Sequence, residues 1–179
     1  MSDQPNWLQP TYDPEAVQPM RDELVAFGFE EMLTPEDVDA KLGQKNDENV
    51  LVMVNSVCGC AAGSARPGIG EALQHSKIPD RMVTVFAGQD KAAVNRVREG
   101  YLSDFPPSSP CIAMLKNGEP VFIIHRHHIE GRSAEDLAAA LTQAFDQTCE
   151  RSGPSITPEQ YEQVNHARAC GSKIPRFDG

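Results

Sequence analysis

Apolar residues near the start of the chain recur at helical spacing and predict two helices. After Asp13, four of them lie three or four positions apart, on one helix face: Val17, Met20, Leu24 and Phe27. Pro14 suits the first turn of this helix, which we expect to end near Gly28. A second, shorter helix is expected over residues 34–43, because Thr34 is a good N-cap and Pro35 suits the first helical position.

Uninterrupted apolar runs predict the buried strands of a sheet. Residues 49–56 and 81–88 form two such runs, each too short and too apolar for a surface helix. Residues 90–102 have the spacing of a helix. Residues 63–76 also favour a helix, although three glycines weaken it and Pro67 is expected to bend it.

The next part of the chain predicts a hairpin and a further helix. Residues 111–127 contain two strand-like runs on either side of the turn residues Asn117 and Gly118, and Ser133 is a good N-cap for a helix that ends near Cys149. The resulting order, after a helical N-terminal region, is β-α-β-α-β-β-α. It predicts an α/β fold, a mixed sheet with helices on both faces.

The last thirty or so residues differ in character from the rest. They are polar and rich in proline and glycine, with one possible short helix at residues 158–169. We therefore expect one domain over residues 1–150, and a C-terminal tail over residues 151–179 that packs on the domain or stays mobile.

Composition narrows the classes of function. The chain has 179 residues with 26 acidic against 16 basic side chains, a net charge of −10, so nucleic acid is a poor candidate partner. The N-terminal fifteen residues have neither a basic nor an apolar signal region, so we expect a cytoplasmic protein. No apolar run approaches the roughly 20 residues that cross a bilayer, so we expect no membrane partner.

The tripeptide Cys58-Gly59-Cys60 directly follows the first buried run. A thiol at this handover from strand to helix meets free backbone N–H groups and the positive end of the helix dipole, which favour the thiolate. A second thiol two positions on can attack a mixed disulfide formed by the first, and Gly59 relaxes the backbone between them. Redox exchange is therefore favoured over two alternatives, metal binding and buried filler.

Three segments together resemble the bacilliredoxin family. They are NSVCGCAAGSARPG around the two thiols, YDPEAVQPMRDELVAFGFEEMLTPEDVDAKL before them and FPPSSPCIAMLKNGEPVFIIHRHHIEGR after them. The resemblance spans residues 12–145 and does not include the tail. It implies a thioredoxin-like fold and a cytoplasmic thiol-disulfide oxidoreductase that removes bacillithiol from mixed disulfides on proteins, with disulfide isomerase activity also attributed to the family.

The resemblance also implies roles for individual residues. Cys58 matches the attacking cysteine of the family and Cys60 the resolving one, with Gly59 as the intervening glycine. Ser109 and Pro110 occupy the place of the cis-proline that faces the active site in thioredoxin-like folds. We expect no cofactor and no bound metal; the expected partners are thiolated proteins and a low-molecular-weight thiol such as bacillithiol.

The other cysteines are weaker candidates. Cys111 is either a third redox thiol or, as we favour, a small buried residue that opens a strand. Cys149, at the end of a predicted helix, is expected to be core or surface filler. Cys170 is expected to be exposed, where it could react.

Histidines, arginines and acidic residues near these segments are further candidates for a role at the site. His125 and His127 would share one strand face, as two metal ligands could. We favour a solvated edge, or a proton donor to a leaving thiolate, over a metal site. Arg66 and Arg126 could supply positive charge near a thiolate or bind a carboxylate of a thiol ligand, although lone arginines more often form surface ion pairs. Six acidic residues are expected on a solvated face: Asp13, Glu15, Asp22, Glu23, Glu30 and Glu31.

The sequence thus favours sulfur exchange, with Cys58 attacking a mixed disulfide and Cys60 resolving the adduct. The main alternative is a metal-binding module in which Cys58, Cys60 and a histidine hold zinc or copper(I). A non-catalytic interaction domain is the third possibility.

Overall fold

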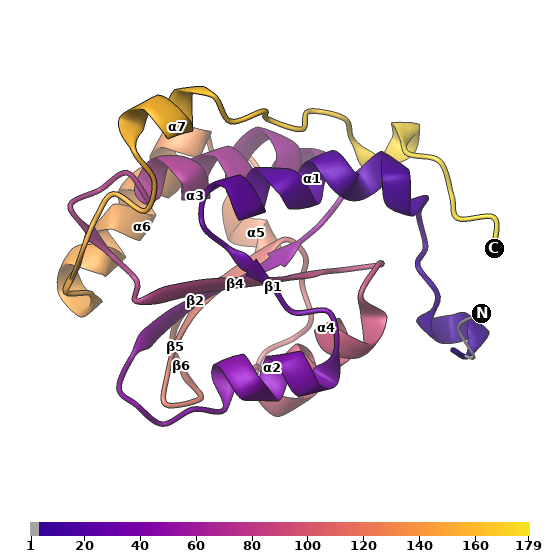
Figure 1. The fold of residues 1–179 in the computed structure, drawn as a ribbon, viewed down its shortest axis with the longest axis horizontal. Helices are drawn as coiled ribbons and strands as arrows, with labels where there is room; N and C mark the ends of the chain where they lie inside the picture. Colours follow the sequence, from indigo (N-terminus) through magenta and orange to yellow (C-terminus); the bar gives the residue numbers. More distant parts are fainter. Residues whose placement is uncertain (1–3) are drawn as a thin grey trace.

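A five-stranded mixed sheet forms the centre of the protein (Figure 1). The computed structural model describes residues 4–179. The first three of the fifteen N-terminal residues considered above for a signal region lie outside the described residues. The strand order is β1-β4-β2-β5-β6; β2 is parallel to β4 and β4 to β1, whereas β5 is antiparallel to both of its neighbours. The strands are β1 (Glu30–Glu31), β2 (Asn49–Asn55), β4 (Arg81–Phe86), β5 (Cys111–Lys116) and β6 (Glu119–Ile124). This is the predicted thioredoxin-like α/β arrangement.

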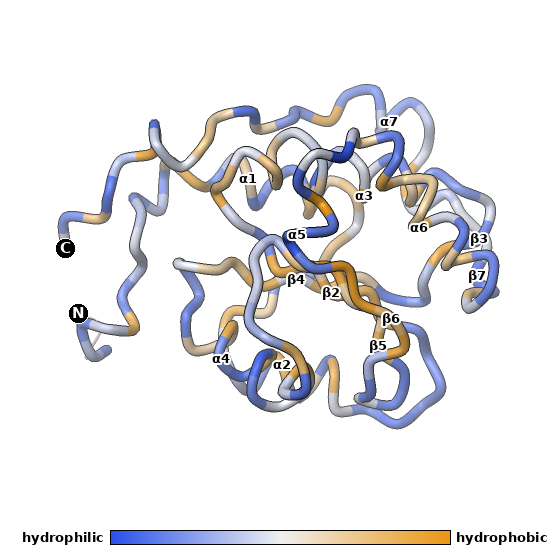
Figure 2. The backbone as a smooth tube through the Cα atoms, turned by 180° about the vertical axis from the view of Figure 1, so that it is seen from behind, coloured by the Kyte–Doolittle hydropathy of each residue, from blue (hydrophilic) through white to orange (hydrophobic). Residues whose placement is uncertain are grey.

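Helices cover both faces of the sheet, and each face has its own apolar core. In β2, Leu51 and Met53 face one core while Val52 faces the other, as the two-residue period of a strand requires. The first core is closed by α1 (Pro14–Ala26), α3 (Arg66–Ala72) and α6 (Ala134–Thr148), and the second by α2 (Pro35–Leu42) and α4 (Lys91–Gly100). Figure 1 shows these two layers on either side of the strands. Figure 2 shows the hydrophobic residues gathered along the strands, and a mostly polar C-terminal tail.

The predicted helix starts are confirmed by their caps. The side chain of Asp13 accepts a hydrogen bond from the backbone of Glu15, and that of Ser133 accepts one from Asp136. Thr34 forms a capping box with Asp37. These local bonds satisfy N–H groups that the first turn of a helix leaves free.

The helix after the two cysteines is continuous, although its glycines and Pro67 weakened the prediction. A π-helical turn, η2 (Ala61–Ala65), leads directly into α3, and Pro67, which has no backbone N–H to donate, lies in the first turn of α3. Gly70 has a packing role, because a Cβ atom there would lie only 2.2 Å from the ring of Phe27. The glycines therefore bring α3 close to its neighbours rather than ending it.

The predicted hairpin is confirmed. Asn117 (φ 54°) and Gly118 (φ 80°) form the turn between β5 and β6 with positive φ angles. The strand assignment of His125 and His127 is wrong, however. Strand β6 ends at Ile124, and His125 caps the short helix α5 (Arg126–Ile129), so the two histidines do not share a strand face.

The C-terminal tail lies on the domain. Strand β7 (Arg151–Ser152) pairs with β3 (Lys77–Ile78), then α7 (Pro158–Glu162) lies over the layer of α1, α3 and α6 (Figure 1). The chain continues through the short turn η3 (Gly171–Lys173) to a bridge between Tyr12 and Arg176, close to the first turn η1 (Asn6–Leu8). The tail therefore returns to the beginning of the chain.

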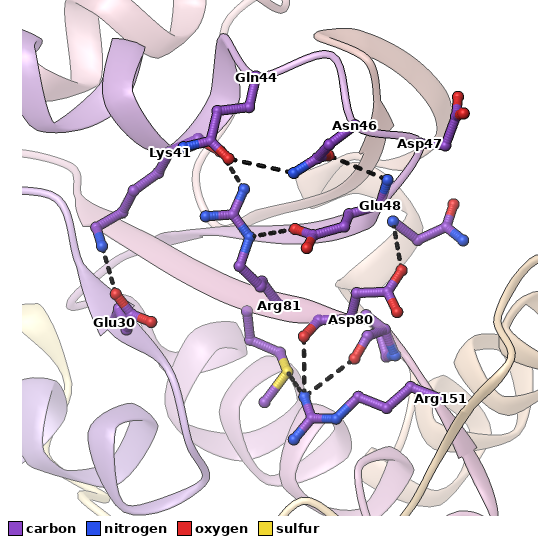
Figure 3. Close-up of polar contacts among 12 residues, drawn as sticks. Glu30, Lys41, Gln44, Asn46, Asp47, Glu48, Asp80, Arg81 and Arg151 are labelled. Carbon is purple, nitrogen blue, oxygen red and sulfur yellow. Dashed lines mark hydrogen bonds and ion pairs between the residues drawn. The ribbon is translucent and has the colours of Figure 1, made fainter.

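A polar cluster closes the end of the sheet where β2 and β4 begin (Figure 3). Arg81 pairs with Glu48, and Arg151 of the tail donates to the backbone carbonyls of Pro79 and Asp80. This cluster anchors the start of the tail. It lies at the opposite end of β2 from the two cysteines.

Among residues 4–179, no helix has the length and apolarity that crossing a membrane requires.

Candidate active site

Cys58 follows β2 at its carboxyl end, three residues after Asn55. Gly59 and Cys60 begin the helical backbone that continues into η2 and α3. Both sulfhydryls are free and partly exposed. Their Sγ atoms lie 2.8 Å apart, so one sulfhydryl donates a hydrogen bond to the other.

The surroundings of Cys58 favour its thiolate. Burial opposes ionisation, but hydrogen bonds to its sulfur from Cys60, the Ser56 side chain and the backbone of Ala61 outweigh burial, and the charge of Arg126 adds to them. Together they lower the pKa of Cys58 below its ordinary value. A lower pKa means more of the nucleophilic thiolate near neutral pH.

Cys60 has the opposite character. Burial, the hydrogen bond to Cys58 and the negative charge of Cys58 together raise its pKa to about 11. Cys60 therefore stays protonated while Cys58 is ionised, and its S–H is the donor in the contact between the two sulfurs. Cys58 is thus the anion of the pair, and Cys60 donates a hydrogen bond to it.

Arg126, at the start of α5, connects the thiols with the loop before β5. Its Nη1 donates to the backbone carbonyl of Ser109 at 3.4 Å, and its Nε pairs with Glu130 at 2.6 Å. The Glu130 hydrogen bond and the negative charge of Cys58 both raise the pKa of Arg126. The Ser109–Pro110 peptide bond is cis, as the resemblance implied.

Arg66 is not a surface residue, so the prediction that it forms a surface ion pair is wrong. Its side chain is fully buried behind the thiols. Nη1 donates to the backbone carbonyl of Ser56 at 2.8 Å and to Asn55 Oδ1 at 3.0 Å. It therefore holds the turn that precedes Cys58, and cannot reach a ligand in solvent.

Glu23 is likewise buried rather than part of a solvated face. Its Oε1 accepts hydrogen bonds from Arg66 Nε at 3.0 Å and from the backbone of Ala167 at 3.1 Å, while its Oε2 lies 2.8 Å from His166 Nδ1. Arg66 Nη2 also donates to the carbonyl of Ala167 at 2.9 Å. We call Glu23, Arg66, His166 and Ala167 the charge cluster; it joins α1, α3 and the tail behind Cys58.

The tail half of this cluster could not be predicted from the sequence, since His166 and Ala167 belong to no motif. Glu23 did carry a signal, because it lies between Met20 and Phe27 on the apolar stripe of α1. A charged residue on such a stripe is buried only with a partner. The partner, Arg66, is 43 positions away in sequence and could not be identified from spacing.

The remaining cysteines lie apart from this pair. Cys111 is buried at the start of β5, and burial raises its pKa to about 11, as expected for a small core residue rather than a redox thiol. Cys149 is part of the core that α6 closes. Cys170 is partly exposed in the tail, and a hydrogen bond from Ser172 lowers its pKa.

The histidines after β6 form a stack instead of a ligand set. His125 is buried, which rules out a solvated edge for it, and its Nδ1 lies 3.0 Å from Ser108 Oγ. Its ring stacks on His127 with centroids 5.6 Å apart. Within residues 4–179, no three histidine, cysteine or acidic side chains are grouped as a metal site would require.

Sulfur exchange is the chemistry that two such thiols support, because one is ready to attack and the other can transfer a proton and then attack in turn. The strand order β1-β4-β2-β5-β6, with helices on both faces, is that of a thioredoxin-like fold. Together with the Cys58 and Cys60 thiols, it identifies the class of protein as a thiol-disulfide oxidoreductase. Known proteins agree: residues 12–149 match the family described as "Disulphide isomerase". The chain belongs to this family. The curated proteins of similar sequence that we compare below are bacilliredoxins.

Two relatives illustrate the similarity. A bacilliredoxin of Cytophaga hutchinsonii is 50% identical over 136 residues, which is 76% of this chain and 98% of the relative. A bacilliredoxin of Salinibacter ruber is 45% identical over 161 residues, which is 89% of this chain and 94% of the relative. An alignment of 161 residues is longer than residues 1–149, so the similarity to the Salinibacter ruber protein extends into the C-terminal tail.

Proposed function

We propose that the protein acts on mixed disulfides between proteins and a low-molecular-weight thiol of the bacillithiol kind, in the cytoplasm. The printed name of the relatives, bacilliredoxin, supports a thiol of this kind. Cys58 is the attacking residue in this proposal and Cys60 the resolving one. Gly59, Ser109 and Pro110 form the immediate surroundings of the reacting sulfurs.

The reaction is an exchange of sulfurs without net oxidation. The Cys58 thiolate attacks the small-thiol sulfur of the mixed disulfide, the old S–S bond breaks, and the protein thiolate leaves and takes a proton. Cys58 then carries the small thiol as a disulfide. Cys60, once deprotonated, attacks Cys58 Sγ and releases the small thiol, which leaves a Cys58–Cys60 disulfide for a reductant to open.

The observation that carries the proposal is the opposite acidity of two sulfurs in contact. The pKa of Cys58 is lowered, while burial and the contact with Cys58 raise that of Cys60 to about 11, at an Sγ–Sγ distance of 2.8 Å. The loss of the Cys58 thiolate in the first step removes the charge that holds the Cys60 proton. Cys60 thereby becomes easier to ionise only after Cys58 has reacted.

Two arginines support the Cys58 thiolate in different ways. Arg126 is exposed at the thiols and supplies positive charge directly. Arg66 is buried, and holds the Ser56 carbonyl so that the Ser56 side chain can bond the Cys58 sulfur. Its burial lowers its own pKa, and the charge of Glu23 keeps it a cation.

The test is a pair of single substitutions examined by intact mass. The Cys60→Ser variant, incubated with a protein that carries bacillithiol or glutathione as a mixed disulfide, is expected to gain the small thiol on Cys58 and to keep it. The Cys58→Ser variant is expected to gain nothing and to release no protein thiol. Cys111→Ser serves as the matched control, because its buried thiol lies apart from the pair, and it should react like the parent.

The outcome that would overturn the proposal is the absence of an adduct on the Cys60→Ser variant while its Cys58 still reacts with iodoacetamide. A stoichiometric metal in the purified protein, lost in both single variants, would support the metal-binding alternative instead.

A further inference from the structure

A cavity of about 540 Å³ lies next to Gly59, between the domain and the tail. Gly59, which is bonded to both cysteines, lines it together with Gly63 and α3 residue Pro67. The first residues of α6 and the tail residues Tyr161 and Arg168 form the other walls. Its volume lies in the range of sites that bind small molecules. Cys58 and Cys60 themselves do not line it, and neither does Arg126, whose charge acts on Cys58.

The charged groups around the cavity are of both signs and lack partners within the protein. Arg168 extends from the tail, Glu71 from α3 and Glu135 from α6. Within residues 4–179, none of the three side chains forms an ion pair or a hydrogen bond with another residue, and neither does the hydroxyl of Tyr161. A ligand that carries both a carboxylate and an ammonium group would satisfy both kinds of charge.

From this arrangement we infer that the cavity binds the small-thiol half of the mixed disulfide, and that this half is an amino-acid-like thiol with an ammonium and a carboxylate group. The inference rests on the proposed function. Arg168 contacts the carboxylate, and Glu71 and Glu135 contact the ammonium group. The sulfur of the bound half then faces Cys58 across Gly59, where the thiolate displaces the protein thiol.

Three symmetric disulfides separate the contributions of the charges. Cystine carries both groups, cystamine only the ammonium group and dithiodipropionate only the carboxylate. Each is mixed with the full-length Cys60→Ser protein, and the rate of adduct formation on Cys58 is measured by intact mass. Each rate is divided by that of the same disulfide with free mercaptoethanol, which removes differences in intrinsic reactivity. Cystine is expected to have the highest ratio.

Charge variants in the same background assign the contacts. Arg168→Ala is expected to slow cystine and dithiodipropionate about two- to five-fold, the effect of one exposed charge, and to leave cystamine unslowed. The double variant Glu71→Gln with Glu135→Gln is expected to slow cystine and cystamine. Arg176→Ala is the matched control, because this tail arginine lies over the ring of Tyr12 and does not line the cavity.

A third variant fills the cavity. A Cβ atom at Gly63 would meet no atom within 4 Å, so a side chain can begin there, and Gly63→Leu is designed to occupy the open space. It is expected to slow all three disulfides, while alkylation of Cys58 by iodoacetamide keeps the parent rate.

Equal rates for the parent, Arg168→Ala and the double glutamate variant with all three disulfides would overturn the inference and leave the proposed function intact. No adduct with any disulfide, in a protein whose Cys58 is alkylated normally, would overturn the proposed function itself.

Discussion

At the scale of single residues, the acidity of Cys58 depends on donors that its immediate neighbours supply. Ser56 and Ala61 lie within three positions of it, and Cys60 within two. Each of these donors stabilises the anion more than the neutral thiol, and together they outweigh the burial that opposes ionisation. The sequence could therefore indicate a reactive thiol at this place, because most of the relevant contacts are local.

The two thiols should separate in an alkylation experiment. Since the pKa of Cys58 is lowered and that of Cys60 is raised to about 11, iodoacetamide at pH ~7, below the ordinary thiol pKa of ~8.5, should modify Cys58 first. The rate at Cys58 should fall as the pH drops through its pKa, because the thiolate is lost. Peptide mass mapping at several pH values measures this. Equal rates at the two cysteines would contradict the assignment of roles.

Removal of the Arg126 charge should make Cys58 less acidic. Arg126 is exposed, so water screens its effect, and Arg126→Ala should slow the alkylation of Cys58 at pH ~7 only about two- to three-fold. The difference should shrink at high salt. Arg132→Ala, at an exposed arginine six positions on, is the control and should leave the rate unchanged. If Arg126→Ala and the parent are alkylated at the same rate at low salt, the charge of Arg126 does not influence the acidity of Cys58.

At the scale of elements, the helix that begins at the cysteines is held in place by what its glycines allow. Gly68 would place a Cβ atom 3.0 Å from the Ala134 carbonyl of α6, and Gly70 would place one inside the ring of Phe27. Both positions let a neighbouring element approach the helix axis. A sequence shows such glycines only as poor helix formers, because the reason for them lies on other elements.

Two glycines of this helical segment should respond in opposite ways to alanine. Gly70→Ala should lower the free energy of unfolding by about 1–3 kcal/mol or more, because its Cβ meets the Phe27 ring at 2.2 Å. Gly63→Ala meets no atom within 4 Å and should leave the free energy unchanged or raise it by up to about 1 kcal/mol. Urea unfolding of both variants gives the comparison. A neutral Gly70→Ala would show that Phe27 does not pack against α3.

The elements that were predicted correctly depend on nearby residues. The caps at Asp13, Thr34 and Ser133 and the turn at Asn117 and Gly118 are each complete within a few positions of the chain. Strands β1, β3 and β7 have two residues each, too few for a period to appear. The burial of Arg66 could not be predicted, because it depends on Glu23 and Ala167; the place of Glu23 on the apolar stripe of α1 indicated burial but not its partner.

At the scale of the whole molecule, the tail is attached by three kinds of contact. Its start is held by Arg151, its middle by the charge cluster, and its end by the packing of Ile174 against Val57 and the apolar side of α1. The tail also supplies Tyr161, which lies 6.1 Å from Phe27 between ring centroids. We therefore propose that residues 151–179 fold with the domain rather than after it.

The charge cluster should contribute strongly to this joint stability. Glu23→Ala leaves the buried Arg66 cation without its counter-ion, and should lower the free energy of unfolding by about 3–5 kcal/mol. Glu23→Gln keeps an acceptor for Arg66 and should lie between the parent and the alanine variant. Asp22→Ala removes the neighbouring exposed carboxylate and should change stability by at most about 0.5 kcal/mol. Urea unfolding, followed by near-ultraviolet circular dichroism, measures all three.

A loss of less than 1 kcal/mol for Glu23→Ala would show that water reaches Arg66 and that the tail does not seal the cluster.

The contact of Ala167 with Arg66 and Glu23 has a consequence for the synthesis of the protein. Chains are made from the amino end, so α1 and the helix of Cys58 exist before residue 167 has been added. Until then, one side of the pair of buried charges is open to water. Ala167 closes that side with one N–H group and one carbonyl group. The support behind the Cys58 thiol is thus completed only once residue 167 has been added, and a chain truncated before that residue lacks it.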